Sequence, residues 1–202
     1  MEEQLSENHK RYLERINFYK DFGYDVEEER KFILEKSCPL YGDIVEVGTG
    51  KGYFTVELAK EGYNFTTIDI SDEEQEFARL NIRYFGLEKL VDFRIENAEY
   101  LSFDNSSFDI IFSINTIHHL TNPAKVTEEL IRIVTLEGKI ILSDFTEDGL
   151  KIINKIHATE GRVHEAGQTS LSEVGNYLEQ RRFGMQKHKS RFQEILIAYR
   201  QR

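Results

Sequence analysis

The segment Asp43-Ile-Val-Glu-Val-Gly-Thr-Gly-Lys-Gly52 decides the fold of this 202-residue chain. A short β-branched run leads through an acidic residue into three alternating glycines, and a helix-like segment, Tyr53 to Glu61, follows at once. Glycines permit positive φ angles and remove the Cβ atoms that would keep a ligand away from the backbone. The helix N-terminus then offers free amides to an anionic group. This pattern predicts a nucleotide-like cofactor site, although strand-to-helix turns also use glycine for structural reasons alone.

The spacing of the glycines indicates which class of cofactor would bind. The dinucleotide fingerprint is G-x-G-x-x-G, whereas this chain reads G-x-G-x-G at Gly48, Gly50 and Gly52. Tyr53 stands where the fingerprint needs its last glycine, which disfavours a nicotinamide-dependent oxidoreductase. The run from Glu46 to Gly52 closely resembles motif I of the class I S-adenosylmethionine-dependent methyltransferases.

An acidic residue follows at the place where a ribose would be held. Asn64-Phe-Thr-Thr-Ile68 is apolar and β-branched, so it predicts a second strand, and this strand ends at Asp69. A carboxylate about 20 residues after the glycines, at the end of the second strand, can accept hydrogen bonds from both ribose hydroxyls.

Later segments continue the resemblance in the family's order, over about residues 42–146. Val91 to Ile95 predicts a third strand, and Asn97-Ala98-Glu99 follows where the family usually has Asp-Ala. The family's acidic side chain holds the adenine amino group; here the amide oxygen of Asn97 or the carboxylate of Glu99 would replace it. Ser107 to Ile114 predicts a fourth strand, and the following Asn115-Thr-Ile-His-His-Leu120 resembles the motif IV region of the small-molecule branch. A turn at residues 136–139 is expected to lead into a fifth strand at residues 140–144.

The resemblance implies an α/β, Rossmann-like fold with a seven-stranded mixed sheet, strand order 3-2-1-4-5-7-6, an antiparallel last strand and helices on both faces. Two final strands are predicted at residues 184–190 and 193–199, the second nearly all apolar, as in a strand covered on both faces. We expect one domain over residues 1–202. Its segments are an N-terminal helical lid (1–40), the cofactor-binding core (41–146), a substrate-side insert (147–169) and a final helix with a β-hairpin (170–202).

The resemblance also implies how S-adenosylmethionine would lie. Its methionine end is expected on the backbone of residues 48–52, its ribose on Asp69 and its adenine near Ile70, Asn97 and Ala98. The predicted cofactor-binding residues are Glu46, Gly48, Thr49, Gly50, Gly52, Tyr53, Asp69, Ile70, Asn97, Ala98, Glu99 and Asn115.

Residues for catalysis and acceptor binding are expected in the motif IV region and in the N-terminal lid. His118 and His119 follow the fourth strand, and an imidazole can act as base or substrate ligand near neutral pH; in the alternative, one of the pair packs locally. Tyr12, Tyr19 and Tyr24 lie in the predicted lid and would contact cofactor or substrate, or form an ordinary aromatic packing stripe.

The insert carries a second group of polar residues. His157, Glu160 and His164 would share one face of a continuous helix. Two imidazoles and a carboxylate match a metal-binding set in composition, but Gly161 interrupts the helix. Three alternatives remain: a metal site, a polar lid in which His157 and His164 contact the substrate, or a solvated helix.

Composition bounds the partners and the compartment. The net charge of −10 disfavours nucleic acid. A single cysteine, Cys38, interpreted as a small buried side chain, excludes an internal disulfide and favours the cytoplasm. The sequence contains no apolar run of membrane-spanning length and begins with acidic residues, unlike a signal peptide. The oligomeric state is not predicted.

These observations predict a methyltransferase that uses S-adenosylmethionine, releases S-adenosylhomocysteine and acts on a small-molecule acceptor. One alternative is an RNA or protein methyltransferase that uses the basic residues near the C-terminus. Another is a non-catalytic S-adenosylmethionine-binding protein. The basic residues in question are Arg181, Arg182, Lys187, Lys189, Arg191, Arg200 and Arg202.

Overall fold

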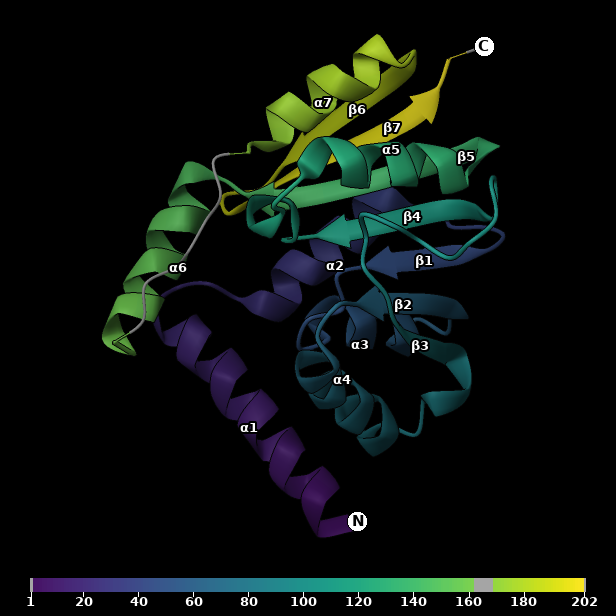
Figure 1. Cartoon of the computed structure of the whole chain (residues 1–202). Helices are drawn as coiled ribbons and strands as arrows, with labels where there is room; N and C mark the ends of the chain where they lie inside the picture. The colour runs from purple at the N-terminus through teal and green to yellow at the C-terminus, as the bar shows by residue number, and fades with distance from the viewer. Residues whose placement is uncertain (1, 162–168, 202) are drawn as a thin grey trace.

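The computed structural model describes residues 2–161 and 169–201 and contains one seven-stranded sheet (Figure 1). The strand order is β3-β2-β1-β4-β5-β7-β6, and β7 pairs antiparallel with both of its neighbours, as predicted. The other neighbouring strands run parallel. The strands are β1 (Ile44–Val47), β2 (Phe65–Asp69), β3 (Val91–Ile95), β4 (Phe108–Ile114), β5 (Val134–Phe145), β6 (Phe183–Lys189) and β7 (Gln193–Arg200).

Helices begin where the sequence offers polar capping groups. Ser71 Oγ accepts the backbone N–H of Glu74, and Ser170 and Glu173 form a complete capping box. The helices are α1 (Glu2–Asp21), α2 (Val26–Ser37), α3 (Tyr53–Lys60), α4 (Asp72–Tyr84), α5 (Pro123–Ile133), α6 (Glu147–Thr159) and α7 (Leu171–Gln180), with the short 3₁₀ helices η1 (Glu88–Leu90) and η2 (Ile117–His119).

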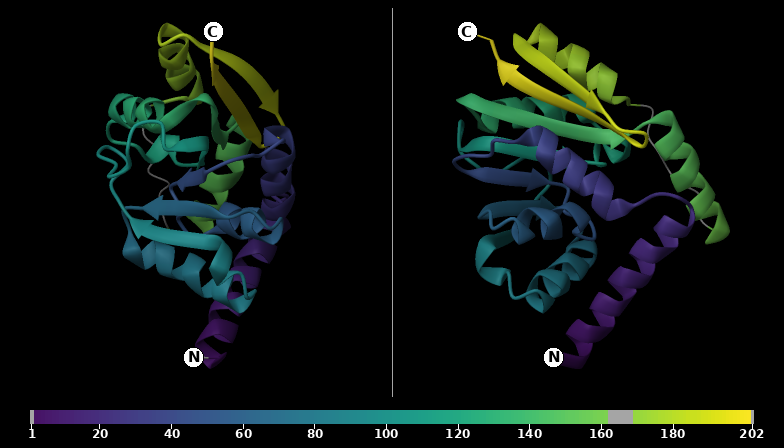
Figure 2. Two further views of the ribbon diagram at one scale, coloured as in Figure 1. Left: turned by 90° about the vertical axis from the view of Figure 1, so that its right-hand side faces the viewer. Right: turned by 180° about the vertical axis from the view of Figure 1, so that it is seen from behind.

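Side chains alternate across the sheet and form two cores. Ile111 packs in the cluster that includes α5 and α7, whereas Ile110 and Phe112 pack with α2 and α3 on the opposite face. Figure 2 shows these two helical layers from the side and from behind. The sheet is therefore covered on both faces, which explains why its central strands read as continuous apolar runs.

A third cluster joins the N-terminal segment to the insert. Tyr12 and Ile16 of α1 pack with Ile153 and Ile156 of α6, next to Phe192 before β7. In Figures 1 and 2, α1 and α6 flank the ends of the strands instead of covering a sheet face. This arrangement leaves the carboxyl ends of β1, β2 and β4 to form a site.

Two local expectations were wrong. The predicted turn at residues 136–139 lies inside β5, where the pairing with β4 shifts between Phe108 and Ile110. Glu137 and Gly138 are therefore part of an irregular strand. Cys38 is exposed because it caps the end of α2 and precedes a loop.

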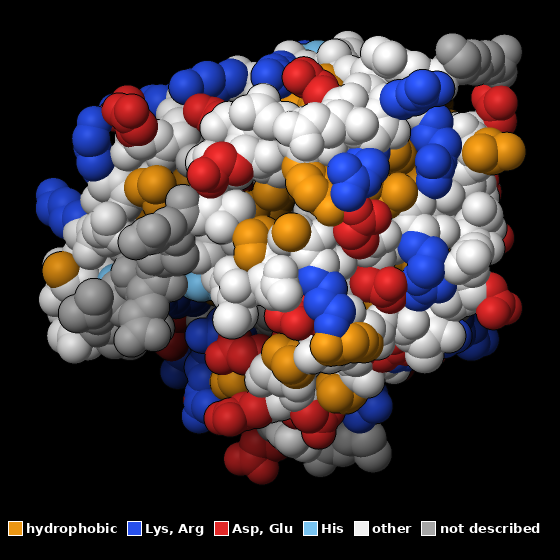
Figure 3. Space-filling model, turned by 45° about the horizontal axis from the view of Figure 1, so that its top comes forward, with side chains coloured by type: hydrophobic (Ala, Val, Ile, Leu, Met, Phe, Trp, Pro, Cys, Tyr) orange, Lys and Arg blue, Asp and Glu red, His pale blue; other side chains and the backbone are white. Residues whose placement is uncertain are grey.

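The face in Figure 3 carries Lys and Arg side chains interspersed with Asp and Glu. Within residues 2–161 and 169–201, no helix is long and apolar enough to cross a membrane.

Candidate cofactor site

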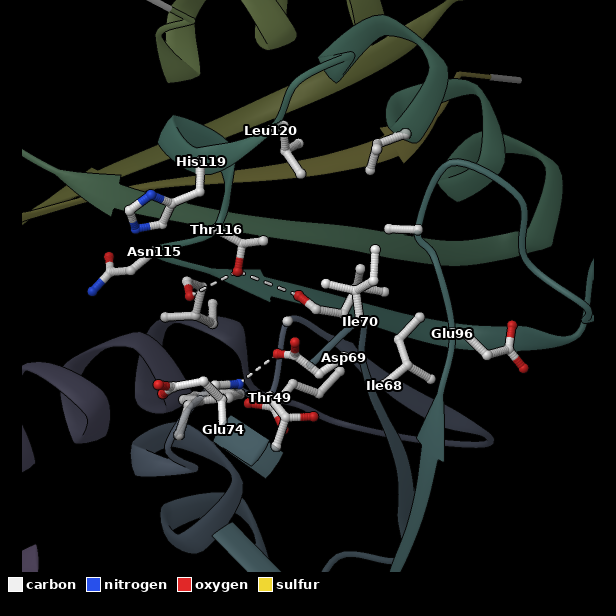
Figure 4. A pocket seen from close by; sticks show the side chains of 18 of the residues that line it. Thr49, Ile68, Asp69, Ile70, Glu74, Glu96, Asn115, Thr116, His119 and Leu120 are labelled. Atoms are coloured by element: carbon white, nitrogen blue, oxygen red, sulfur yellow. Dashed lines mark hydrogen bonds between the residues drawn. The ribbon is translucent and has the colours of Figure 1, made fainter. Parts of the chain in front are cut away.

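A cavity of about 710 Å³ lies at the carboxyl ends of β1, β2 and β4. Such a volume is typical of small-molecule sites, and this end of a parallel sheet is where such sites occur. Its wall is built from the loop after β1, the ends of β2 and β4, the loop after β3, and α2 (Figure 4). Most predicted cofactor residues are on this wall: Glu46, Gly48, Thr49, Gly50, Tyr53, Asp69, Ile70, Asn97, Ala98, Glu99 and Asn115.

Two glycines of the loop have different roles. Gly50 has a φ of +49°, and a Cβ added there would meet nothing within 4 Å. The absence of a side chain at Gly50 therefore keeps this part of the cavity open. Gly52 has a φ of +79°, and an added Cβ would lie 2.5 Å from the Cβ of Ala78. Gly52 was predicted to contact the cofactor; the structure instead places it in the tight packing between α3 and α4.

Asp69 is fixed at the end of β2 by two backbone amides. Its Oδ2 accepts the N–H of Gly50 at 2.7 Å, and its Oδ1 accepts the N–H of Ser71 at 2.9 Å. Each carboxylate oxygen can accept a second hydrogen bond. The side chain lines the cavity, so it has the position and the acceptor capacity that a ribose diol needs.

Glu46 lies below the glycine loop and is only 1% exposed. Its Oε2 accepts hydrogen bonds from the hydroxyls of Thr55 at 2.6 Å and Thr67 at 2.7 Å. Burial raises the pKa of Glu46 to about 7; the two hydroxyls oppose this shift, nearby Asp69 adds to it and Arg30 opposes it. Its charge therefore changes near neutral pH.

The residues that follow β2 and β3 suit a flat apolar group with polar edges. Ile70 is 70% exposed at the cavity rim, and Ala98 lines the same region. The Oδ1 of Asn97 accepts the N–H of Glu99 at 2.9 Å, so this amide also stabilises the turn after β3.

The end of β4 presents two polar side chains to the cavity, and Figure 4 shows both Asn115 and His119 extending from this strand end. Asn115 adopts a φ of 54°, and its amide O and N are both buried without a hydrogen-bond partner among the described residues. A buried amide without partners is costly. It therefore marks a place where a ligand would bind.

The structure separates the two adjacent histidines. His118 is buried, and its Nδ1 lies 2.6 Å from Oδ1 of Asp144, whose Oδ2 accepts the His118 backbone N–H at 3.2 Å. His119 is exposed and lines the cavity, with its ring 4.0 Å from that of His118. Only His119 is therefore positioned to contact a bound ligand directly.

The three tyrosines of the predicted lid also separate. Tyr12 is buried and stacks on Tyr53 at 5.4 Å, and the Tyr19 hydroxyl accepts a hydrogen bond from Arg15 at 3.0 Å. Tyr24 is 1% exposed, and its hydroxyl accepts a hydrogen bond from Gln193 at 2.9 Å. This core position does not fit the substrate contact predicted for Tyr24.

Two of the three insert residues can be placed. His157 is in the last turn of α6, which ends before Gly161, and Glu160 forms an ion pair with Arg15 of α1. His164 lies outside the described residues. Within residues 2–161 and 169–201, no group of three or more His, Cys, Asp or Glu is arranged to hold a metal. The carboxylate of Glu160 ties the insert to α1.

Arg30 of α2 was missed by the sequence analysis. It is 7% exposed and lines the cavity. Its helix is strongly charged, but the helical spacing of Val26, Arg30 and Ile33 places Arg30 on the buried face of α2, a signal that could have found it. The packing of α2 then brings this face to the cavity.

Comparisons with known proteins find related methyltransferases. The family model described as a methyltransferase domain matches residues 45–142. The chain is 28% identical to the methyltransferase GfsG of Streptomyces halstedii, over 66% of this chain and 49% of that protein. It is 30% identical to a ubiquinone biosynthesis O-methyltransferase of Xylella fastidiosa, over 54% of this chain and 45% of that protein. The chain thus spans about half the length of these relatives.

Solved structures share the fold. A SAM-dependent methyltransferase from Methanosarcina mazei superposes with a TM-score of 0.63 at 21% identity, covering 84% of this chain and 98% of that chain. In its glycine loop, its sheet order and the methyltransferase-domain model that matches residues 45–142, the chain is similar to the class I S-adenosylmethionine-dependent methyltransferases.

Proposed function

We propose that this protein transfers a methyl group from S-adenosylmethionine to a small-molecule acceptor. The observation that carries the proposal is the glycine loop bonded to Asp69 at the wall of the 710 Å³ cavity. The open space at the Cβ position of Gly50 fits a ligand that lies against the loop, and so does the amide of Asn115, which has no hydrogen-bond partner within residues 2–161 and 169–201.

The charges of the cavity support a cationic cofactor. Five carboxylates stand on its wall against two basic side chains, Arg30 and Lys51, so a sulfonium group is attracted electrostatically. The carboxylates are Glu46, Asp69, Glu74, Glu96 and Glu99.

When bound, the cofactor supplies a methyl group already activated by the positive charge on its sulfur. The residues of this chain then need to hold the acceptor in line, exclude water and remove a proton from a protonated acceptor. We infer that His119, which lines the cavity, accepts this proton from the acceptor. The ring of His118, which is bonded to Asp144, lies 4.0 Å from the ring of His119.

A small acceptor is supported by the enclosure and by the relatives. Residues of α1 and α6 share one apolar cluster beside the strand ends, and two helices in this position would favour a small acceptor over a large polymer. The Xylella fastidiosa relative is named for O-methylation in ubiquinone biosynthesis. We leave oxygen, nitrogen, sulfur and carbon nucleophiles open for this chain.

The basic C-terminal face gives less support to an RNA or protein acceptor. Arg181 forms an ion pair with Glu128, and Lys189 forms one with Glu194 at 3.0 Å. These carboxylates offset part of the positive charge of the C-terminal face. The non-catalytic alternative rested on Asn97, which replaces the acidic residue usual in the family. The side-chain oxygen of Asn97 accepts the backbone N–H of Glu99 within its own turn.

The test combines binding with turnover. Titration with S-adenosylmethionine and S-adenosylhomocysteine comes first. A panel of phenols, catechols, amines and thiols is then incubated with isotope-labelled cofactor, with Asp69→Ala as the inactive control. We expect both ligands to bind and one acceptor class to gain label. Binding without transfer to any small molecule would favour the non-catalytic alternative, and absence of binding would overturn the proposal.

A further inference from the structure

Gln75 is a polar residue on the buried face of α4. Ala78 and Ile82 follow at helical spacing, and all three side chains are buried. Burying an amide costs free energy unless its N–H and C=O groups find hydrogen-bond partners. The partners of this amide therefore decide what Gln75 does in the fold.

The side-chain amide of Gln75 joins three segments around the glycine loop. Its Nε2 lies 3.0 Å from the Thr49 hydroxyl, 3.1 Å from the carbonyl oxygen of Arg94 in β3 and 3.4 Å from that of Thr67 in β2. Its Oε1 accepts a hydrogen bond from Arg79 at 2.5 Å. Carbonyl oxygens only accept and a guanidinium only donates, so these neighbours fix the orientation of the amide. The nitrogen of Gln75 therefore faces Thr49 and donates to it.

The donation from Gln75 begins a chain of hydrogen bonds that ends below the glycine loop. The hydroxyls of Thr49 and Thr67 are 2.6 Å apart, and the Thr67 hydroxyl donates to Oε2 of Glu46 at 2.7 Å. A threonine hydroxyl has one proton to donate. Because Thr67 gives its proton to Glu46, Thr49 donates to Thr67, and the Thr49 oxygen accepts from Gln75. All three donors thus point toward the carboxylate.

Two members of this chain belong to the cofactor cavity. Glu46 and Thr49 line it, whereas Gln75 is fully buried within the fold. The backbone N–H of Thr49 also donates to the carbonyl oxygen of Ile68 in β2 at 3.0 Å, so backbone and side chain of Thr49 are both held. Gln75 therefore acts on the cavity through residues that line it.

We propose that Gln75 is a positioning residue for the cofactor, which through Thr49 holds the glycine loop against β2 and directs the hydroxyl donors toward Glu46. This inference rests on the proposed function. Donors that point at a carboxylate favour its charged form, and each donor in a chain polarises the next. The loop and the carboxylate are thus ordered before the cofactor arrives, which lowers the cost of binding.

The first test is a double-mutant cycle between Gln75 and Thr49, measured by calorimetric titration with S-adenosylhomocysteine. Gln75→Met removes the donor at similar size, and Thr49→Val removes the hydroxyl. Each single variant should bind about 10-fold more weakly, the effect of one lost hydrogen bond. The double variant should also lose about 10-fold, because both changes interrupt the same chain.

A double-variant loss equal to the product of the two single losses would overturn the inference, and so would unchanged binding by Gln75→Met. Either result would leave the proposed function intact. Failure of the unchanged protein to bind S-adenosylhomocysteine would instead overturn the proposed function itself. Thermal unfolding of each variant checks that the fold persists.

Asn81→Leu is the matched control. Asn81 is the other buried amide of α4, but its Nδ2 donates to the carbonyl oxygen of Phe77 within the same helix, at 3.1 Å. This variant should bind S-adenosylhomocysteine normally. A loss equal to that of Gln75→Met would show a general effect of polar groups in α4 and would overturn the specific role of Gln75.

The second test follows the ¹³C signal of the Glu46 carboxyl through its titration. Gln75→Met should weaken the donation from Thr67 and so raise the pKa of Glu46 further, whereas a role in packing alone would leave this pKa unchanged. The charged groups Asp69 and Arg30 also act on Glu46, and both are present in every variant. An unmoved pKa would overturn the inference.

A measurement on the unchanged protein covers the case in which Gln75→Met fails to fold. The Nε2 protons of Gln75 should show a nuclear Overhauser contact with the side chain of Thr49, because the two groups are hydrogen-bonded at 3.0 Å. This contact would support the chain of donors, and its absence would overturn it.

Discussion

The carboxylate of Asp69 and the backbone N–H of Gly50 are joined by a hydrogen bond of 2.7 Å. This contact ties the end of β2 to the loop between β1 and α3. The residue expected to hold the ribose therefore also fixes the loop on which the methionine end of the cofactor is expected to lie.

Asp69→Ala should weaken S-adenosylhomocysteine binding about 100-fold, because two hydrogen bonds to a charged acceptor are lost. The free energy of unfolding should change by only about 1 kcal/mol, since the freed amides can reach water. Calorimetry and urea unfolding measure the two effects. Asp72→Ala is the control, because that carboxylate is 75% exposed and pairs with Arg79. An unchanged affinity for Asp69→Ala would show that the ribose lies elsewhere.

The two glycines of the loop should separate binding from stability. Gly52→Ala should lower the free energy of unfolding by about 3 kcal/mol, because its Cβ would lie 2.5 Å from that of Ala78 and its φ is +79°. Gly50→Ala should cost only about 1 kcal/mol but weaken cofactor binding, because the new Cβ enters the cavity.

Gly62→Ala is the matched control for the second variant. Gly62 has a φ of +85° and open space around its Cβ position, and it caps the distant end of α3. It should show the same small loss of stability as Gly50→Ala and normal binding. If all three variants bound the cofactor alike, the loop would not lie under it.

Glu46 should make the stability of the unliganded protein depend on pH. Burial raises its pKa from 4.5 to about 7 in the folded state, so folding is favoured by its protonated form. This stabilisation is fully present below the unfolded pKa of 4.5 and is lost as pH rises through about 7, a change of about 3 kcal/mol. Chemical unfolding of wild type and Glu46→Gln between pH 4.5 and 8 measures the difference. Parallel curves would show that the carboxyl does not titrate in this range.

His119→Ala should lower kcat for a protonated acceptor about 10²- to 10⁴-fold and leave S-adenosylhomocysteine affinity unchanged. The measurement uses the acceptor identified in the panel. His188→Ala, on β6 and away from the cavity, should retain full turnover. Retention of kcat by His119→Ala would exclude it as the proton acceptor and direct attention to other polar groups on the wall.

The sequence by itself determined the sheet, the glycine loop and the position of Asp69. These features depend on short-range rules, because apolar runs form buried strands, glycines allow the turn, and a residue at the end of β2 lies beside the loop after β1. The strand order was predicted by resemblance and is confirmed.

Only the tertiary structure decided which side chains reach the cavity. His118 and His119 are neighbours in sequence, yet one is held by Asp144 from β5 and the other lines the cavity. Tyr24 and Arg30 lie close together in the chain, but Tyr24 is bound to Gln193 of β7 while Arg30 also lines the cavity. The physical reason is that each outcome depends on partners more than 25 residues away, and no local pattern specifies such contacts.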